Sequence, residues 1–172
     1  SVLTFTVVGG IMRGAGDIIA NGLLWLHDSL GVIGGAIFGL IYAPFTLTGM
    51  HHSLVTAETQ ILANIGTLGG SPTFAVVAAS NVAQGAAALA VFFIIKKNAK
   101  MKSTASAAGI SALLGITEPA VFGVNLKLMY PFIGALIGSA IGSAYATCMN
   151  VLALSQGPAG LPGIIVIRPQ SM

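Results

Sequence analysis

The sequence is poor in charged residues. Only 6% of its 172 residues are Asp, Glu, Lys or Arg, whereas 55% are hydrophobic and the mean hydropathy is +0.94. A soluble domain carries about a quarter charged residues, because those side chains cover its water-facing surface. The composition therefore argues against an ordinary soluble domain and predicts an integral membrane protein.

Cysteine and nucleotide-binding motifs are also scarce. Cys148 is the one cysteine, which excludes a disulfide framework and a CxxC metal site. It has no basic neighbour that would favour a thiolate, so we expect it to pack rather than to react. Neither GxxxxGK[ST] nor GxGxxG is present, so we expect no nucleotide bound by those routes and no cofactor.

The few basic residues do not form a face that could follow a phosphate backbone, so nucleic acid is not an expected partner. Four of the seven lie together, as Lys96, Lys97, Lys100 and Lys102. We expect them to form a cytoplasmic loop over residues 96–102 that fixes the orientation in the membrane. An ordinary solvated connector has the same composition.

The two ends of the chain look cut. Ser1 is not an initiator methionine, no basic signal-peptide region follows it, and Met172 comes just after an apolar run. We therefore expect a piece of a longer polypeptide.

Long uncharged runs predict membrane helices. Two of them, residues 74–95 and 132–154, are expected to be full spans, because about 20 apolar residues cross about 30 Å of hydrocarbon. Residues 29–50 are also long enough, but Pro44 is expected to break their second half. Residues 14–30 are amphipathic and contain Trp25, which favours an interfacial helix over an ordinary connecting loop.

A first polar segment interrupts this apolar pattern at residues 53–65. It carries Glu58, Gln60 and Asn64, which makes it too polar to face lipid. Irregular or re-entrant backbone is tolerated at membrane depth where it lines a cavity. We expect such backbone here.

A second interruption lies at residues 115–119, with the sequence GITEP. The residue before a proline is driven out of the helical region, and proline is favoured at the start of a helix. We expect a half-helix that begins at Pro119 and is closed by Asn125 and Lys127. The predicted fold is therefore all-α and membrane-integral, with spanning helices and two broken or re-entrant helical hairpins, a pattern typical of transporter binding sites.

Glu118 is the main candidate functional residue. An acid in apolar surroundings is energetically expensive and is usually functional. It could bind the hydroxyls of a polar solute, together with the hydroxyl of Thr117, which both donates and accepts. The alternative is a structural carboxylate that caps the half-helix at its positive end.

His51 and His52 have three interpretations. A zinc site would require further ligands, and Glu58 is the only acid nearby. Either histidine could instead be a packed structural residue, or it could hydrogen-bond a hydroxylated solute or carry a proton. Adjacent residues point in different directions, so at most one is expected to face the solute.

Glu58 follows His51 by one heptad and would share its face if the intervening residues were helical. It would then be a further ligand, or it would simply pair with a histidine or a helix end.

Together these motifs resemble a known family. GITEP at residues 115–119 and GMHHS at residues 49–53 resemble the two signatures of enzyme IIC, the membrane component of the bacterial sugar phosphotransferase system, glucose superfamily. Their order and separation match, and residues 11–17, 80–85 and 157–163 fit as well. The resemblance covers essentially the whole chain and is greatest for the sucrose branch, followed by the trehalose and β-glucoside carriers.

The resemblance implies a multi-pass permease of the bacterial cytoplasmic membrane that moves a disaccharide inward while it is phosphorylated. In the family, the GITEP glutamate and the first histidine bind the sugar, and these fall on Glu118 and His51. Thr117 is implied beside them, with His52 and Glu58 as further candidates. Glucose and maltose carriers have an arginine at the position of Ala43, so their substrates are not expected here.

The resemblance also implies the partners and the reaction. A phosphocysteine on enzyme IIB donates the phosphoryl group to the sugar, with Glu118 orienting the hydroxyl or accepting its proton. Residues 1–172 would be the C-terminal, transport half of the membrane unit, without enzyme IIA or IIB. They would be inactive alone, and would belong to a lipid-embedded homodimer that acts as a protein-Nπ-phosphohistidine–sugar phosphotransferase.

Two other functional classes remain open from the sequence. One is an ion- or proton-coupled sugar transporter without phosphorylation, in which Glu118 and a histidine carry protons. The other is a channel or a structural membrane subunit, which predicts no saturable solute binding.

Overall fold

The computed structural model describes residues 21, 22, 25, 29–48, 51–63 and 69–167, of which residues 51–53 through the backbone alone. The described elements are helices, and the two isolated β-bridges found among them belong to no strand. The predicted all-α membrane fold is confirmed. The predicted interfacial segment, residues 14–30, lies mostly outside the described residues.

Three described helices are long and apolar enough to cross a membrane: Ser29–Leu47, α4 (Thr73–Ile94) and α8 (Tyr130–Cys148). The bounds of α4 agree with the prediction to within one residue. The prediction of two full spans was one short, because Pro44 does not break the first helix. Pro44 lies in the last turn of this helix, where Thr46 donates from its hydroxyl to the carbonyl of Ala43 at 2.6 Å.

Small residues bring these helices close together. Ser139 of α8 donates to the carbonyl of Gly39 at 2.6 Å, and a Cβ at Gly39 would lie 2.7 Å from the carbonyl oxygen of Ser139. Gly85 of α4 meets Gly109 in the same way, with 3.0 Å between an added Cβ and the Gly109 carbonyl. Close backbone approach of this kind is usual where helices associate in lipid.

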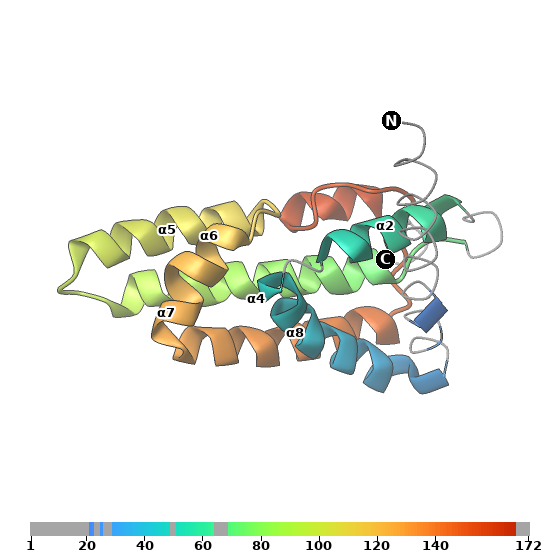
Figure 1. Cartoon of the computed structure of the whole chain (residues 1–172), viewed down its shortest axis with the longest axis horizontal. Coiled ribbons are helices and arrows are strands. Elements are labelled where there is room, and N and C mark those ends of the chain that lie inside the picture. The colour runs from blue at the N-terminus through green and yellow to red at the C-terminus, as the bar shows by residue number, and fades with distance from the viewer. Residues whose placement is uncertain (1–20, 23–24, 26–28, 49–50, 64–68, 168–172) are drawn as a thin grey trace, which may run out of the picture.

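A broken hairpin follows α4, as predicted. Helix α5 (Ala99–Leu113) runs back along α4 and ends near the middle of the long axis (Figure 1). Its 15 residues make it about 22 Å long, too short to cross about 30 Å of hydrocarbon. The chain then turns at Gly115, which has a φ of +105°, and a new helix starts at Glu118.

The helix that starts at Glu118 has three parts: α6 (Glu118–Ala120), the π-helical η1 (Val121–Asn125) and α7 (Leu126–Leu128). Its start agrees with the prediction to within one residue, with Pro119 as its second residue. It ends at Met129, where φ is +60°.

The first polar segment, residues 53–65, was predicted to be irregular or re-entrant backbone that lines a cavity. Its described residues are not irregular but belong to a regular helix, α2 (His51–Ala63). Leu54, Ala57 and Ile61 are buried at helical spacing, which gives this segment a packed face. Its polar side chains are therefore compatible with a helix.

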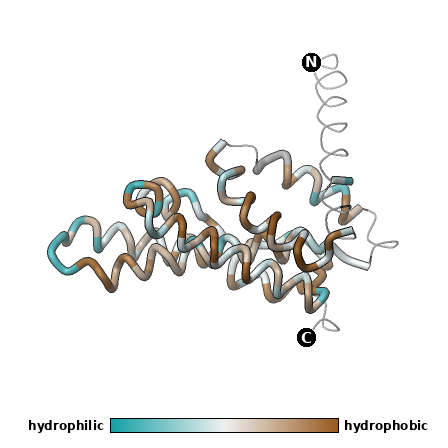
Figure 2. Tube along the Cα trace, turned by 90° about the horizontal axis from the view of Figure 1, so that it is seen from below, coloured by the Kyte–Doolittle hydropathy of each residue, from teal (hydrophilic) through white to brown (hydrophobic). Residues whose placement is uncertain are grey.

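The loop over residues 96–102 is also shorter than predicted. Asn98 caps α5 by accepting a hydrogen bond from the Met101 backbone at 3.0 Å, so Lys100 and Lys102 lie in its first turn. The hydrophilic residues nevertheless gather at this tip of the α4–α5 hairpin (Figure 2).

The chain after α8 forms the C-terminal arm, residues 149–167. Helix α8 ends at Cys148, earlier than the predicted residue 154, because Asn150 adopts a φ of +51°. Cys148 is exposed, so its predicted packing role is wrong. The arm pairs through Ala153 with Ser71, and it contains the 3-10 helix η2 (Leu161–Val166).

Candidate functional site

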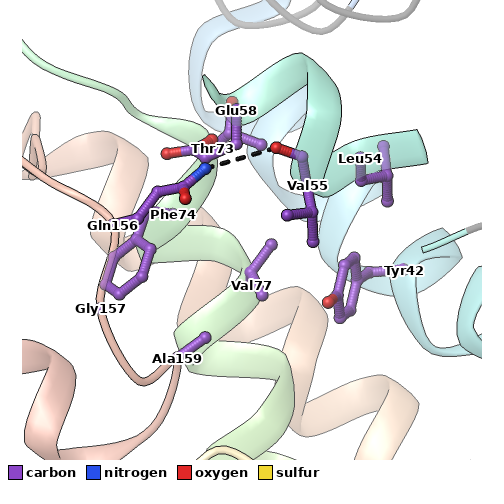
Figure 3. Close-up of a pocket in the computed structure, with 10 residues that line it drawn as sticks. All are labelled: Tyr42, Leu54, Val55, Glu58, Thr73, Phe74, Val77, Gln156, Gly157 and Ala159. Carbon is purple, nitrogen blue, oxygen red and sulfur yellow. Dashed lines mark hydrogen bonds between the residues drawn. The ribbon is translucent and has the colours of Figure 1, made fainter. Parts of the chain in front are cut away.

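A pocket of about 140 Å³ lies between α2, α4, the end of the first long helix and the C-terminal arm (Figure 3). Its walls are mostly apolar, with a few polar side chains. The lining residues are Tyr42, Leu54, Val55, Glu58, Thr73, Phe74, Val77, Gln156, Gly157 and Ala159. An apolar pocket with a few polar groups is the usual form of a small-molecule site.

Glu58 is the most unusual of the lining residues. It is 7% exposed, and both of its carboxylate oxygens are buried without a hydrogen-bond partner among the described residues. Burial raises the pKa of Glu58, and the nearby Ser71 hydroxyl offsets only part of that rise. Because a buried carboxyl without partners is expensive, its presence in the pocket indicates a ligand group.

Gln156 attaches the C-terminal arm to α2. Its amide nitrogen donates to the Thr59 hydroxyl at 2.8 Å and to the Val55 carbonyl at 3.4 Å. The arm is also tied to α4, since Asn81 donates to the carbonyl of Ala159 at 2.6 Å. These bonds fix one wall of the pocket.

The GITEP turn, residues 115–119, meets this arm backbone to backbone. A Cβ at Gly115 would lie 3.1 Å from the nitrogen of Ala159, and one at Gly160 would lie 2.8 Å from the nitrogen of Gly115. Only glycines allow this approach. The turn therefore lies directly behind the pocket wall that Ala159 forms.

The GITEP side chains are placed by this turn. Thr117 is buried and Glu118 is exposed at the first position of the new helix. Glu118 and Glu58 both lie close enough to Tyr42 to act electrostatically on its phenol. The two acidic residues thus belong to one region.

A pair of buried amides supports the helix that carries Glu118. Asn125 in η1 donates to the backbone carbonyl of Gln84 at 3.1 Å and to its side-chain oxygen at 2.6 Å, and both residues are fully buried. Single π-helical turns are frequent at functional sites. From the sequence, Asn125 was predicted only to close the helix, and its contact with Gln84 was missed.

The other predicted site residues have mixed outcomes. His51 and His52 start α2, but their side chains lie outside the described residues. Glu58 lies in the middle of α2 and lines the pocket together with Thr73, the first residue of α4, so its pairing with a histidine or a helix end stays a prediction. Tyr42 and Gln156 were missed, because neither stands out among its sequence neighbours and both reach the pocket only through the tertiary fold.

The sequence is similar to a family of known proteins. Residues 1–139 match the family model described as "Phosphotransferase system, EIIC". The chain is 58% identical over 169 residues to the "PTS system sucrose-specific EIIBC component" of Staphylococcus xylosus, covering 98% of this chain and 35% of that protein. It is 56% identical to the protein of that name from Vibrio alginolyticus, covering 99% and 36%.

A third relative has a different printed specificity. The "PTS system trehalose-specific EIIBC component" of Bacillus subtilis is 41% identical, covering 97% of this chain and 35% of that protein. The chain thus spans about a third of the length of these relatives. No solved structure matches it.

Proposed function

The chain belongs to the EIIC family of the phosphotransferase system, and we propose that it carries the sugar site of a sucrose permease. The observation that carries this proposal is the 58% identity to a sucrose-specific component, against 41% for the trehalose-specific one. Ala43 supports it, because a buried alanine stands where glucose and maltose carriers are expected to have arginine. The bacterial relatives and the three apolar helices indicate a bacterial cell membrane protein.

The working unit of this proposal is larger than the chain. In this proposal residues 1–172 are the C-terminal part of an EIIC membrane unit and are inactive alone. The complete unit works as a homodimer in lipid. The names of the relatives support an EIIB domain fused to the same polypeptide. The whole protein is then a protein-Nπ-phosphohistidine–sugar phosphotransferase of the sucrose type.

In the proposed mechanism, sugar hydroxyls replace water by binding Glu118 and His51, with Thr117, His52 and Glu58 as further ligands. The exposed carboxylate of Glu118 at a helix start suits this role. The 6-hydroxyl oxygen of the glucosyl unit attacks the phosphorus of the EIIB phosphocysteine. An O–P bond forms, the S–P bond breaks, the cysteine leaves as thiolate, and Glu118 accepts the hydroxyl proton.

A gradient-driven sugar transporter is not supported as an alternative. The matching family and the three relatives described above are all components of the phosphotransferase system. We therefore propose no ion coupling.

The substitution Glu118→Gln in the full-length carrier tests the ligand role. Hydrogen bonds to a charged group contribute about 1.5–3 kcal/mol each, so we expect sucrose affinity to fall about 10- to 100-fold in calorimetric titration. Lys127→Gln is the matched control, since it removes one exposed charge near the end of the same helix. Equal affinity of Glu118→Gln and wild type would reject the role of Glu118.

A further inference from the structure

Glu58 and Glu118 lie in different surroundings, which suggests that they bind different parts of the sugar. Glu58 is buried in the pocket, whereas Glu118 is exposed at the start of the helix that follows the GITEP turn. We propose that Glu58, Gln156 and Tyr42 form a second subsite, which binds the sugar unit that is not phosphorylated. This inference rests on the proposed function and adds to it the residues that select the second unit.

Glu58 has unmet hydrogen-bonding capacity. Its two carboxylate oxygens are buried and have no partner among the described residues, although they line a pocket. A carboxylate accepts hydrogen bonds, and sugar hydroxyls donate them. A bound sugar unit would therefore provide donors beyond the nearby Ser71 hydroxyl.

Gln156 and Tyr42 bring further polar groups to the pocket. Gln156 uses its amide nitrogen to hold α2, which leaves its side-chain oxygen as an acceptor at the pocket. Tyr42 lies on the opposite side of the view in Figure 3 and brings a phenol that donates and accepts. Its ring packs edge-on against Phe38, with 6.1 Å between the ring centroids, which fixes its position.

The shape and the walls of the pocket also suit one sugar unit. A sugar ring has hydroxyls on its rim and apolar C–H groups on its faces, and the pocket offers Phe74, Val77 and Leu54 beside its polar groups. Its volume of about 140 Å³ is below the roughly 300 Å³ at which pockets for whole small-molecule ligands begin. The pocket therefore fits part of a disaccharide better than the whole molecule.

The pocket also lies beside the GITEP turn. Gly115 of the GITEP turn touches Ala159, which lines the pocket, and Tyr42 lies within electrostatic reach of both Glu58 and Glu118. A disaccharide can thus place one unit at Glu118 and the other at Glu58. The subsite at Glu58 would then distinguish disaccharides that share a glucosyl unit.

The test is Glu58→Leu in the full-length carrier, titrated with two probes. Sucrose carries both sugar units, and methyl α-glucoside carries the glucosyl unit alone. We expect sucrose affinity to fall at least about 10-fold, because bonds to the charged group are lost, while methyl α-glucoside affinity changes less than about 3-fold. Glu118→Gln should weaken both probes.

Three results would overturn the second subsite. Glu58→Leu with unchanged sucrose affinity would make Glu58 structural, and equal losses for both probes would assign Glu58 to the same unit as Glu118. A variant with lower thermal stability than wild type would also contradict the inference, since removal of an unpaired buried carboxyl should not destabilise the fold. Failure of the proposed function would be distinguishable, because the wild-type carrier would then not bind sucrose at all.

Discussion

The contact between the GITEP turn and the C-terminal arm can be tested by adding one methyl group, in Gly160→Ala. Gly160 has a φ of −155°, an extended conformation that alanine adopts easily, so the effect should be purely steric. The new Cβ would overlap the carbonyl oxygen of Leu113 and lie 2.8 Å from the nitrogen of Gly115. Both are backbone atoms, so the turn itself has to move.

The size of the effect follows from this overlap. Overpacking of this kind costs about 1–3 kcal/mol, and here the strain falls on the turn that leads to Glu118. If the bound state requires the native turn, sucrose affinity should fall about 5- to 150-fold. We expect a similar loss in the free energy of unfolding.

The assay combines thermal unfolding of the purified full-length carrier with sucrose titration. Gly134→Ala is the matched control, because a Cβ at Gly134 meets nothing within 4 Å and the residue lies inside α8. Alanine in a helix interior should raise stability by about 0.5–1 kcal/mol without changing sucrose affinity. If Gly160→Ala behaved like wild type in both measurements, the turn and the arm would not be in contact in the working carrier.

Two further predictions concern buried polar groups. Asn125→Leu removes both hydrogen bonds to Gln84 and leaves its buried side-chain oxygen without a donor, so unfolding should become easier by about 1–3 kcal/mol. An unchanged melting temperature would show that the pair does not hold the helix. Glu58 has a raised pKa in the folded state, so wild-type stability should fall as the pH rises from the ordinary carboxyl range, about 4.3, through the folded value. Glu58→Leu should lack this decline when thermal unfolding is measured between about pH 4 and pH 8. Parallel curves for the two proteins would contradict the assignment of the decline to Glu58.

The local features of the fold were predictable from the sequence where one physical rule dominated. Uncharged length predicted α4 to within one residue, and the preference of proline for helix starts predicted the beginning of the new helix to within one residue. The prediction for Pro44 was wrong, since the helix continues through this residue to Leu47. A proline removes one backbone hydrogen bond, and here that loss falls close to the end of the helix.

The site was less predictable because its residues meet only in three dimensions. The polarity around Glu58 suggested irregular backbone, whereas α2 buries Glu58 on the same face as Leu54 and Ile61. No local pattern marks Tyr42 or Gln156, which lie far apart in the chain and line the same pocket. The roles of His51 and His52 stay predictions.

The most direct test of the central claim is the chemical form in which sucrose enters cells that carry the full-length protein. We expect labelled sucrose to be recovered inside as sucrose phosphate, and its uptake to require phosphoenolpyruvate. In Glu118→Gln both should be lost. Accumulation of free sucrose that is driven by a proton or ion gradient, without phosphoenolpyruvate, would contradict the proposed function.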